Sequence, residues 1–210
     1  MPSRPTLIVI SGPAGSGKTT LAHMIASAVG CPAICRDEIK EGMVHATWGH
    51  AAQGFVARPG DELTAKTLPV FFGVLDLLLR SGVTTVAEAA FTDHVWRPRL
   101  EPLLDLAQLR IVHCTVDDGL ASRRVRQRAR DDPLRRAHAD PGPQAPGPQA
   151  PGPQAPGPQA PGRPAFARVV MDAPSLEVDT TDGYRPGLDH IVAFVNGLAR
   201  PGPAACGQDG

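Results

Sequence analysis

The chain has 210 residues, with 21 basic and 21 acidic side chains and a formal net charge of zero. This length allows one domain with a sizeable core, and the neutral balance does not require a nucleic acid or an anionic membrane as partner. No stretch approaches the ~20 apolar residues of a membrane span, and the short N-terminal apolar run lacks a signal-peptide layout, so we expect a cytoplasmic protein.

The first predicted strand, Thr6–Ser11, leads directly into a complete phosphate-binding pattern, G-x-x-x-x-G-K-[ST], and then into a helix over Gly17–Val29 that Gly30 ends. Strand, glycine loop and helix together predict a site for ATP and Mg²⁺. In such a site backbone N–H groups surround the phosphates, Lys18 reaches the β/γ oxygens and the Thr19 hydroxyl faces the metal. The residues predicted to bind the nucleotide are Gly12, Pro13, Ala14, Gly15, Ser16, Gly17, Lys18, Thr19 and Thr20.

A short second strand is predicted over Pro32–Cys35 and a helix over Glu38–Ala46. Asp37 would then lie at the carboxyl end of the strand, where the phosphate loop also opens. There it would accept a proton from an incoming hydroxyl or hold Mg²⁺ through water, with Lys40 one helical turn away to pair with the acceptor or a phosphate. A plain helix N-cap is the alternative role for Asp37.

Residues 47–60 are expected to form a loop, followed by a long apolar helix from Asp61 to Arg80 that packs on the sheet and kinks at Pro69. The β-branched segment Val83–Ala87 is predicted to be a buried strand that ends at Glu88. A carboxylate at this point is a candidate group for Mg²⁺ or for the acceptor, and the alternative is that it caps the following turn.

The rest of the chain continues the alternation, with helices predicted over His94–Ala107, Asp117–Arg130 and Gly187–Leu198 and strands over Leu109–Cys114 and Leu176–Asp179. Because parallel neighbours need crossover connections, this order predicts an α/β fold with a five-stranded parallel sheet and helices on both faces.

Five arginines crowd the helix Asp117–Arg130: Arg123, Arg124, Arg126, Arg128 and Arg130. Like charges one turn apart repel each other, and a bound polyanion would turn that repulsion into attraction. We expect Arg126 and Arg130 to stabilise charge on a transferring phosphoryl group. A solvated arginine surface is the alternative.

From Pro141 the unit Pro-Gly-Pro-Gln-Ala occurs four times. Proline lacks the N–H needed for helix or sheet and the segment is poor in apolar side chains, so residues 141–162 are predicted to be a disordered insert. The globular domain would comprise residues 1–140 and 163–199, with a flexible tail over 200–210. The repeat has two alternative interpretations, a neutral expansion within a loop or a ligand for a proline-binding module.

Acceptor specificity is expected in two loop-like stretches, 41–60 and 91–100, whose candidate residues are Trp48, His50, Arg58, Trp96 and Arg97. His113 is expected in the core. No C-x-x-C pair occurs among the cysteines, so Cys31, Cys35 and Cys114 are interpreted as small buried side chains and Cys206 as a tail thiol, with a metal site as the alternative.

Gly12–Thr20 followed by Cys35–Lys40 resembles the small P-loop kinases of the polynucleotide kinase, zeta toxin and chloramphenicol phosphotransferase group, which have an AAA-type ATP-binding domain. Glu88 with Phe91-Thr-Asp is similar to that group's third strand, and Arg123–Arg136 to the start of its lid. Val178–Thr181 is similar to the strand before its adenine-contacting loop. The likeness covers about residues 1–135 and 165–198.

This resemblance implies a P-loop NTPase three-layer sandwich with an arginine-bearing lid, in which Lys18 and Thr19 bind ATP and Mg²⁺ and Asp37 is the general base. The group usually has Arg where this chain has Lys40, which cannot give a planar bidentate contact. The proline repeat also lies at or just after the expected lid.

We therefore expect a kinase that transfers the γ-phosphoryl group of ATP to a hydroxyl of a small molecule. One alternative is a polynucleotide 5′-hydroxyl kinase, against which the neutral charge and few aromatics argue. The other is a nucleotide-dependent ATPase or switch with no acceptor.

Overall fold

The computed structural model describes residues 4–48, 62–91, 93–131, 166 and 168–198. Five strands form one sheet in the order β2-β3-β1-β4-β5, and every neighbouring pair is parallel. The strands are β1 (Thr6–Ser11), β2 (Ala33–Cys35), β3 (Thr85–Glu88), β4 (Gln108–Thr115) and β5 (Ser175–Asp179). The α/β fold with a five-stranded parallel sheet is therefore confirmed.

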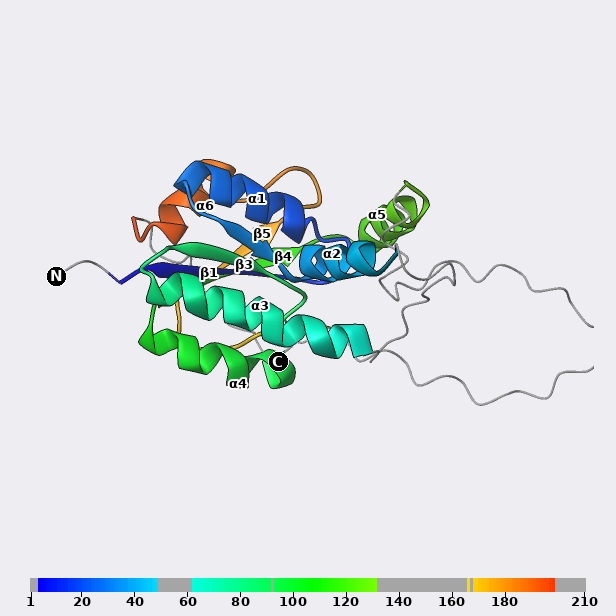
Figure 1. Cartoon of the computed structure of the whole chain (residues 1–210). Helices are drawn as coiled ribbons and strands as arrows, with labels where there is room; N and C mark the ends of the chain where they lie inside the picture. Colours follow the sequence, from blue (N-terminus) through cyan, green and yellow to red (C-terminus); the bar gives the residue numbers. More distant parts are fainter. Residues whose placement is uncertain (1–3, 49–61, 92, 132–165, 167, 199–210) are drawn as a thin grey trace, which may run out of the picture.

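Helices cover both faces of this sheet (Figure 1). They are α1 (Lys18–Val29), α2 (Arg36–Trp48), α3 (Glu62–Arg80), α4 (Asp93–Leu100), the 3₁₀ helix η1 (Glu101–Asp105), α5 (Asp118–Asp131) and α6 (Leu188–Val195). None of the helices in the described ranges combines the length and hydropathy that crossing a bilayer requires.

Two apolar clusters lie on opposite faces of the sheet because successive strand residues point to opposite sides. Leu7 and Val9 of β1 pack with α3, α4 and η1, whereas Ile8 and Ile10 pack with α1 and α6. In Figure 1, α1 and α6 accordingly lie above the sheet and α3 and α4 below it. Since β1 is central and buried on both sides, the loop after it starts from the middle of the core.

An aromatic cluster fills the face under α3 and α4. Trp96 is 4% exposed, and its ring packs edge-on against Phe91 at 4.6 Å and against Phe71 at 5.9 Å between centroids. The interpretation of residues 91–100 as loop-like, with Trp96 as a candidate acceptor residue, therefore does not hold, whereas a helix is present where one was predicted from His94. Residues 93–100 form α4, whose Trp96 side faces the core, and Arg97 pairs with Asp93 one turn away at 3.0 Å.

Several element boundaries differ from the prediction. The helix expected over His94–Ala107 is two elements, α4 and η1, and α3 continues through Pro69. The second strand ends at Cys35 and α2 begins at once with Arg36, so Asp37 lies in the first turn of a helix. His113 is 8% exposed on β4, as expected, and burial lowers its pKa.

Other predictions concern parts of the chain outside the described residues. These are the N-cap Asp61, the candidate acceptor residues His50 and Arg58, the repeat over 141–162, the tail over 200–210 and the part of the expected lid after residue 131.

Candidate active site

The phosphate loop leaves β1 at the carboxyl edge of the sheet and ends in the first turn of α1. Two of its glycines, Gly12 and Gly15, lie where a side chain would collide with neighbouring backbone. A Cβ on Gly12 would lie 2.5 Å from the carbonyl oxygen of Cys114, and one on Gly15, whose φ is +79°, would lie 2.5 Å from that of Ala121. The loop is thus held closely between β4 and α5, and only glycine fits at both positions.

Lys18, Thr19 and Glu88 meet beside this loop. Lys18 Nζ donates to the carbonyl oxygen of Pro13 over 3.1 Å and lies 3.8 Å from Glu88 Oε1. The Thr19 hydroxyl donates to Glu88 Oε2 over 3.3 Å. The ammonium and hydroxyl predicted to meet a triphosphate and its metal therefore converge on one carboxylate from β3.

Strand register explains why Glu88 reaches this place. It lies opposite Ile10, the residue before the end of β1, on one side and Cys35, the last residue of β2, on the other. Glu88 is 2% exposed, and burial together with the nearby carboxylates of Asp37 and Glu38 raises its pKa, while Lys18 and Thr19 lower it. Burial is the largest of these effects, so a further cation beside this carboxylate would stabilise its ionised form.

The loop also keeps polar groups available for a ligand. Ser16 Oγ is fully buried, and no described residue forms a hydrogen bond with it. An unsatisfied buried hydroxyl is costly unless a ligand or water completes it. A phosphate oxygen fits this requirement, because the neighbouring Lys18 and the N-terminus of α1 both favour an anion. The oxygens of Thr19 and Glu88 are in turn the hard ligands that Mg²⁺ prefers.

Asp37 and Lys40 occupy the start of α2, next to the carboxyl edge of β2. Asp37 is half-buried and lies 3.4 Å from the guanidinium of Arg36, and it is near enough to Glu88 to raise that residue's pKa. Lys40 is 4% exposed. The structure therefore brings Asp37 to the side of the Lys18–Thr19–Glu88 group, on a helix that begins where the strand ends.

Arg124 of α5 contacts the phosphate loop. Its guanidinium donates to the carbonyl oxygens of Gly15, over 3.4 Å, and Thr180, over 3.0 Å. Arg126 and Arg130, the two that sequence spacing favoured, are exposed on the same helix. Spacing identified the basic helix, but only the packing of Ala121 against Gly15 shows which of its sides faces the loop.

Thr180, just after β5, contacts the phosphate loop, a role that the resemblance of Val178–Thr181 to the strand before an adenine-contacting loop did not include. Its hydroxyl is within hydrogen-bond distance of the carbonyl oxygens of Ser16, at 2.8 Å, and Thr115, at 3.0 Å. Because Thr180 is also contacted by Arg124, the ends of β4 and β5 are tied to the middle of the phosphate loop. A Thr-Thr pair after a strand gives no distinctive sequence signal for such a role.

The chain is similar to known proteins in sequence and in fold. The sequence profile of the AAA domain family AAA_33 matches residues 7–140. The search of curated proteins gave no match.

Solved structures of kinases share the fold across nearly the whole chain. A candidate kinase from Chloroflexus aurantiacus J-10-fl has a TM-score of 0.71 at 19% identity, covering 94% of this chain and all of the other. A sugar kinase from Janibacter sp. HTCC2649 has a TM-score of 0.52 at 16% identity, covering 93% and 96%. A gluconokinase from Sinorhizobium meliloti 1021 has a TM-score of 0.51 at 16% identity, covering 94% and 95%.

Proposed function

The chain belongs to the AAA domain family AAA_33 and has a P-loop kinase-like fold, and from this premise we propose that it is an ATP-dependent kinase that phosphorylates a hydroxyl of a small molecule. The observation that carries this proposal is the convergence of Lys18, Thr19 and Glu88 beside the phosphate loop.

In the proposed site the loop Gly12–Thr20 binds the phosphates of ATP, and the hydroxyl of Thr19 with the carboxylate of Glu88 holds Mg²⁺. The bound metal would neutralise charge on the phosphates. Lys18, which contacts Pro13 and Glu88, would exchange these contacts for phosphate oxygens. Such an exchange keeps the largely buried Lys18 ammonium next to an anionic or carbonyl oxygen both before and after ATP binds.

Asp37 is proposed as the group that orients the acceptor hydroxyl and takes up its proton. Two features support the role. It lies at the same sheet edge as Glu88, whose pKa it influences, and it is partly open to solvent, so that an acceptor has access to its carboxylate. Lys40 and the exposed Arg126 and Arg130 remain proposed contacts of the acceptor and of the transferring phosphoryl group.

A small acceptor is favoured over a nucleic acid. The zero net charge removes the general attraction for a polyphosphate backbone. Two of the fold's neighbours are named as kinases of a sugar and of gluconate, which makes polyhydroxylated metabolites the first class to test.

The direct test is transfer of labelled γ-phosphate from Mg·ATP to panels of sugars, sugar acids, other hydroxylated metabolites and a 5′-hydroxyl oligonucleotide. The proposal predicts a labelled small molecule with wild-type protein and none with Lys18→Ala. Label only on the oligonucleotide would instead identify a polynucleotide kinase. Release of phosphate that no acceptor accelerates would identify an ATPase.

A further inference from the structure

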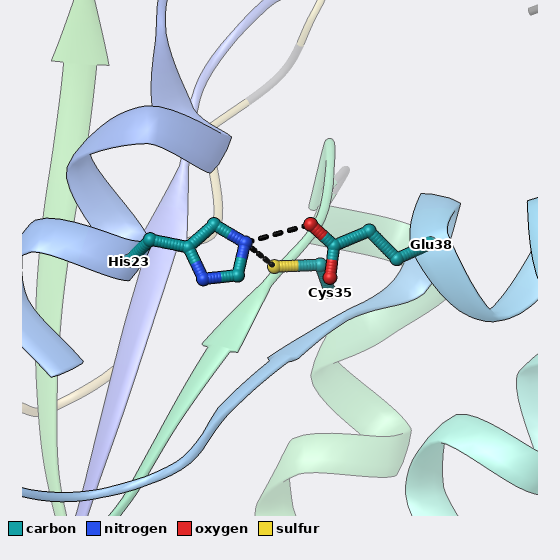
Figure 2. A group of neighbouring side chains, drawn as sticks. All are labelled: His23, Cys35 and Glu38. Atoms are coloured by element: carbon teal, nitrogen blue, oxygen red, sulfur yellow. Dashed lines mark hydrogen bonds and ion pairs between the residues drawn. The ribbon is translucent and has the colours of Figure 1, made fainter. Parts of the chain in front are cut away.

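A second group of side chains converges close to this site. His23 from α1, Cys35 from the end of β2 and Glu38 from the first turn of α2 point toward one another (Figure 2). His23 Nε2 lies 2.7 Å from Glu38 Oε1 and 3.8 Å from Cys35 Sγ, and the three potential ligand atoms all lie within 4.8 Å of one another.

We propose that His23, Cys35 and Glu38 form a binding site for one Zn²⁺ ion. One nitrogen, one sulfur and one oxygen are a donor set that this borderline-soft ion accepts, whereas Mg²⁺ prefers oxygen alone. Three protein ligands leave a fourth, tetrahedral position for water. The site is distinct from the proposed Mg²⁺ position at Thr19 and Glu88.

The distances are close to those that a tetrahedral ion imposes. Bond lengths of about 2.0 Å to nitrogen and oxygen and about 2.3 Å to sulfur place nitrogen and oxygen about 3.3 Å apart and nitrogen and sulfur about 3.6 Å apart. The measured nitrogen-to-oxygen separation, 2.7 Å, is shorter than its value, and the nitrogen-to-sulfur separation, 3.8 Å, is slightly longer than its own. The side chains of His23 and Glu38 are 51% and 47% exposed, so a small rotation of either can open their contact.

Access and charge also favour a cation here. His23 lines an open hollow of about 680 Å³ along α1, so an ion can reach its ring from solvent. Cys35 is buried at the base of the group, close enough to the carboxylates of Glu88, Glu38 and Asp37 for their charges to raise its pKa along with burial. The same carboxylates would attract a divalent ion, and its binding would release the thiol proton to solvent.

Such an ion would link the two helices that carry the proposed catalytic groups. His23 is one helical turn after Thr19 on α1, and Glu38 follows Asp37 on α2. Without the ion, the contact between His23 and Glu38 is a half-exposed pair, which contributes little to stability.

Cobalt titration of the full-length, chelator-treated and reduced protein tests the proposal. One equivalent of Co²⁺ is expected to give thiolate-to-cobalt charge-transfer absorption and intense tetrahedral visible bands, and one equivalent of Zn²⁺ should abolish both. Cys35→Ser should remove the charge-transfer absorption, while the matched control Cys31→Ser, whose thiol precedes β2 and lies outside the group, should retain it.

His23→Gln and Glu38→Gln change exposed side chains and keep the variants measurable if Cys35→Ser does not fold. Each should weaken Zn²⁺ binding about tenfold or more and reduce the rise in melting temperature that Zn²⁺ causes in the wild type. Absence of thiolate absorption in the wild type, or unchanged Zn²⁺ affinity in both variants, would overturn the proposal. These readouts need no ATP or transferase activity, so they are independent of the proposed function.

Discussion

Thr19, in the first turn of α1, and Glu88, the last residue of β3, are separated by 69 positions in the sequence, and the Thr19 hydroxyl donates to the Glu88 carboxylate. This contact exists because β3 lies next to β1 in a parallel sheet, so both strands end at the same edge. A buried carboxylate between a threonine and a lysine is therefore the centre of the proposed metal and phosphate site.

The raised pKa of Glu88 predicts a pH-dependent cost of keeping it ionised. Its native pKa lies above the ordinary value because burial disfavours the charged form, so native stability is lost as pH rises through that pKa. Glu88→Gln should therefore unfold like the wild type at pH 4 and become relatively more stable as pH rises. Thermal unfolding between pH 4 and 8 measures this, and a relative stability that falls with pH would contradict it.

Asp37→Asn tests the proposed proton acceptor. Loss of a general base lowers turnover by about 10²–10⁴-fold, while the phosphate loop is untouched. We expect kcat for phosphoryl transfer to fall within this range and the affinity for Mg·ATP to change little. Asp172→Asn, at an exposed position shortly before β5, is the matched control and should transfer at the wild-type rate. Equal rates in both variants would remove Asp37 from the mechanism.

Arg124 and Arg126 are expected to behave differently although they lie on one helix. Arg124→Ala removes the guanidinium contacts to Gly15 and Thr180, which should cost about 1–2 kcal/mol of stability and weaken nucleotide binding. Arg126→Ala changes an exposed side chain and should stay within about 0.5 kcal/mol. Denaturant unfolding of both variants compares them, and equal losses would contradict the contacts described for Arg124.

Trp96 should affect stability and leave acceptor recognition unchanged. Trp96→Ala removes a ring that packs on Phe91 and Phe71, and such a truncation costs about 3–5 kcal/mol. Leu77→Ala, at a residue 65% exposed on α3, is the control and should cost much less. Trp96→Phe should fold and keep the KM for the acceptor, and a large rise in that KM would restore Trp96 as a specificity residue.

Lys18, whose place beside the phosphate loop was predicted, and Trp96, whose burial was not, show how far the sequence could predict the structure. The phosphate loop, its flanking strand and helix and the parallel sheet follow from local pattern, because the glycines and the alternation of elements have few other interpretations. A helix was predicted around Trp96, but not the side of that helix on which the ring packs. Its burial depends on α3, whose contact with α4 no local pattern encodes.

The sequence also did not predict which residues on a helix surface face the site. The arginines of α5 are spaced so that several sides of the helix are basic, and the choice of Arg124 depends on how Ala121 packs against Gly15. The meeting of His23 with Cys35 and Glu38 likewise depends on the crossing of α1 past the end of β2. Contacts of this kind depend on the register of the sheet. That register is set by the packing of the whole core, so no short stretch of sequence predicts it.

Isothermal calorimetry with ATP and Mg²⁺, comparing wild-type protein with Lys18→Ala, tests the central claim most directly. Lys66→Ala, at an exposed position on α3, is the matched control. The account predicts one nucleotide site in the wild type and in the Lys66 variant, with affinity greatly reduced when Lys18 is removed. Equal binding by all three proteins, or no binding by the wild type, would contradict it.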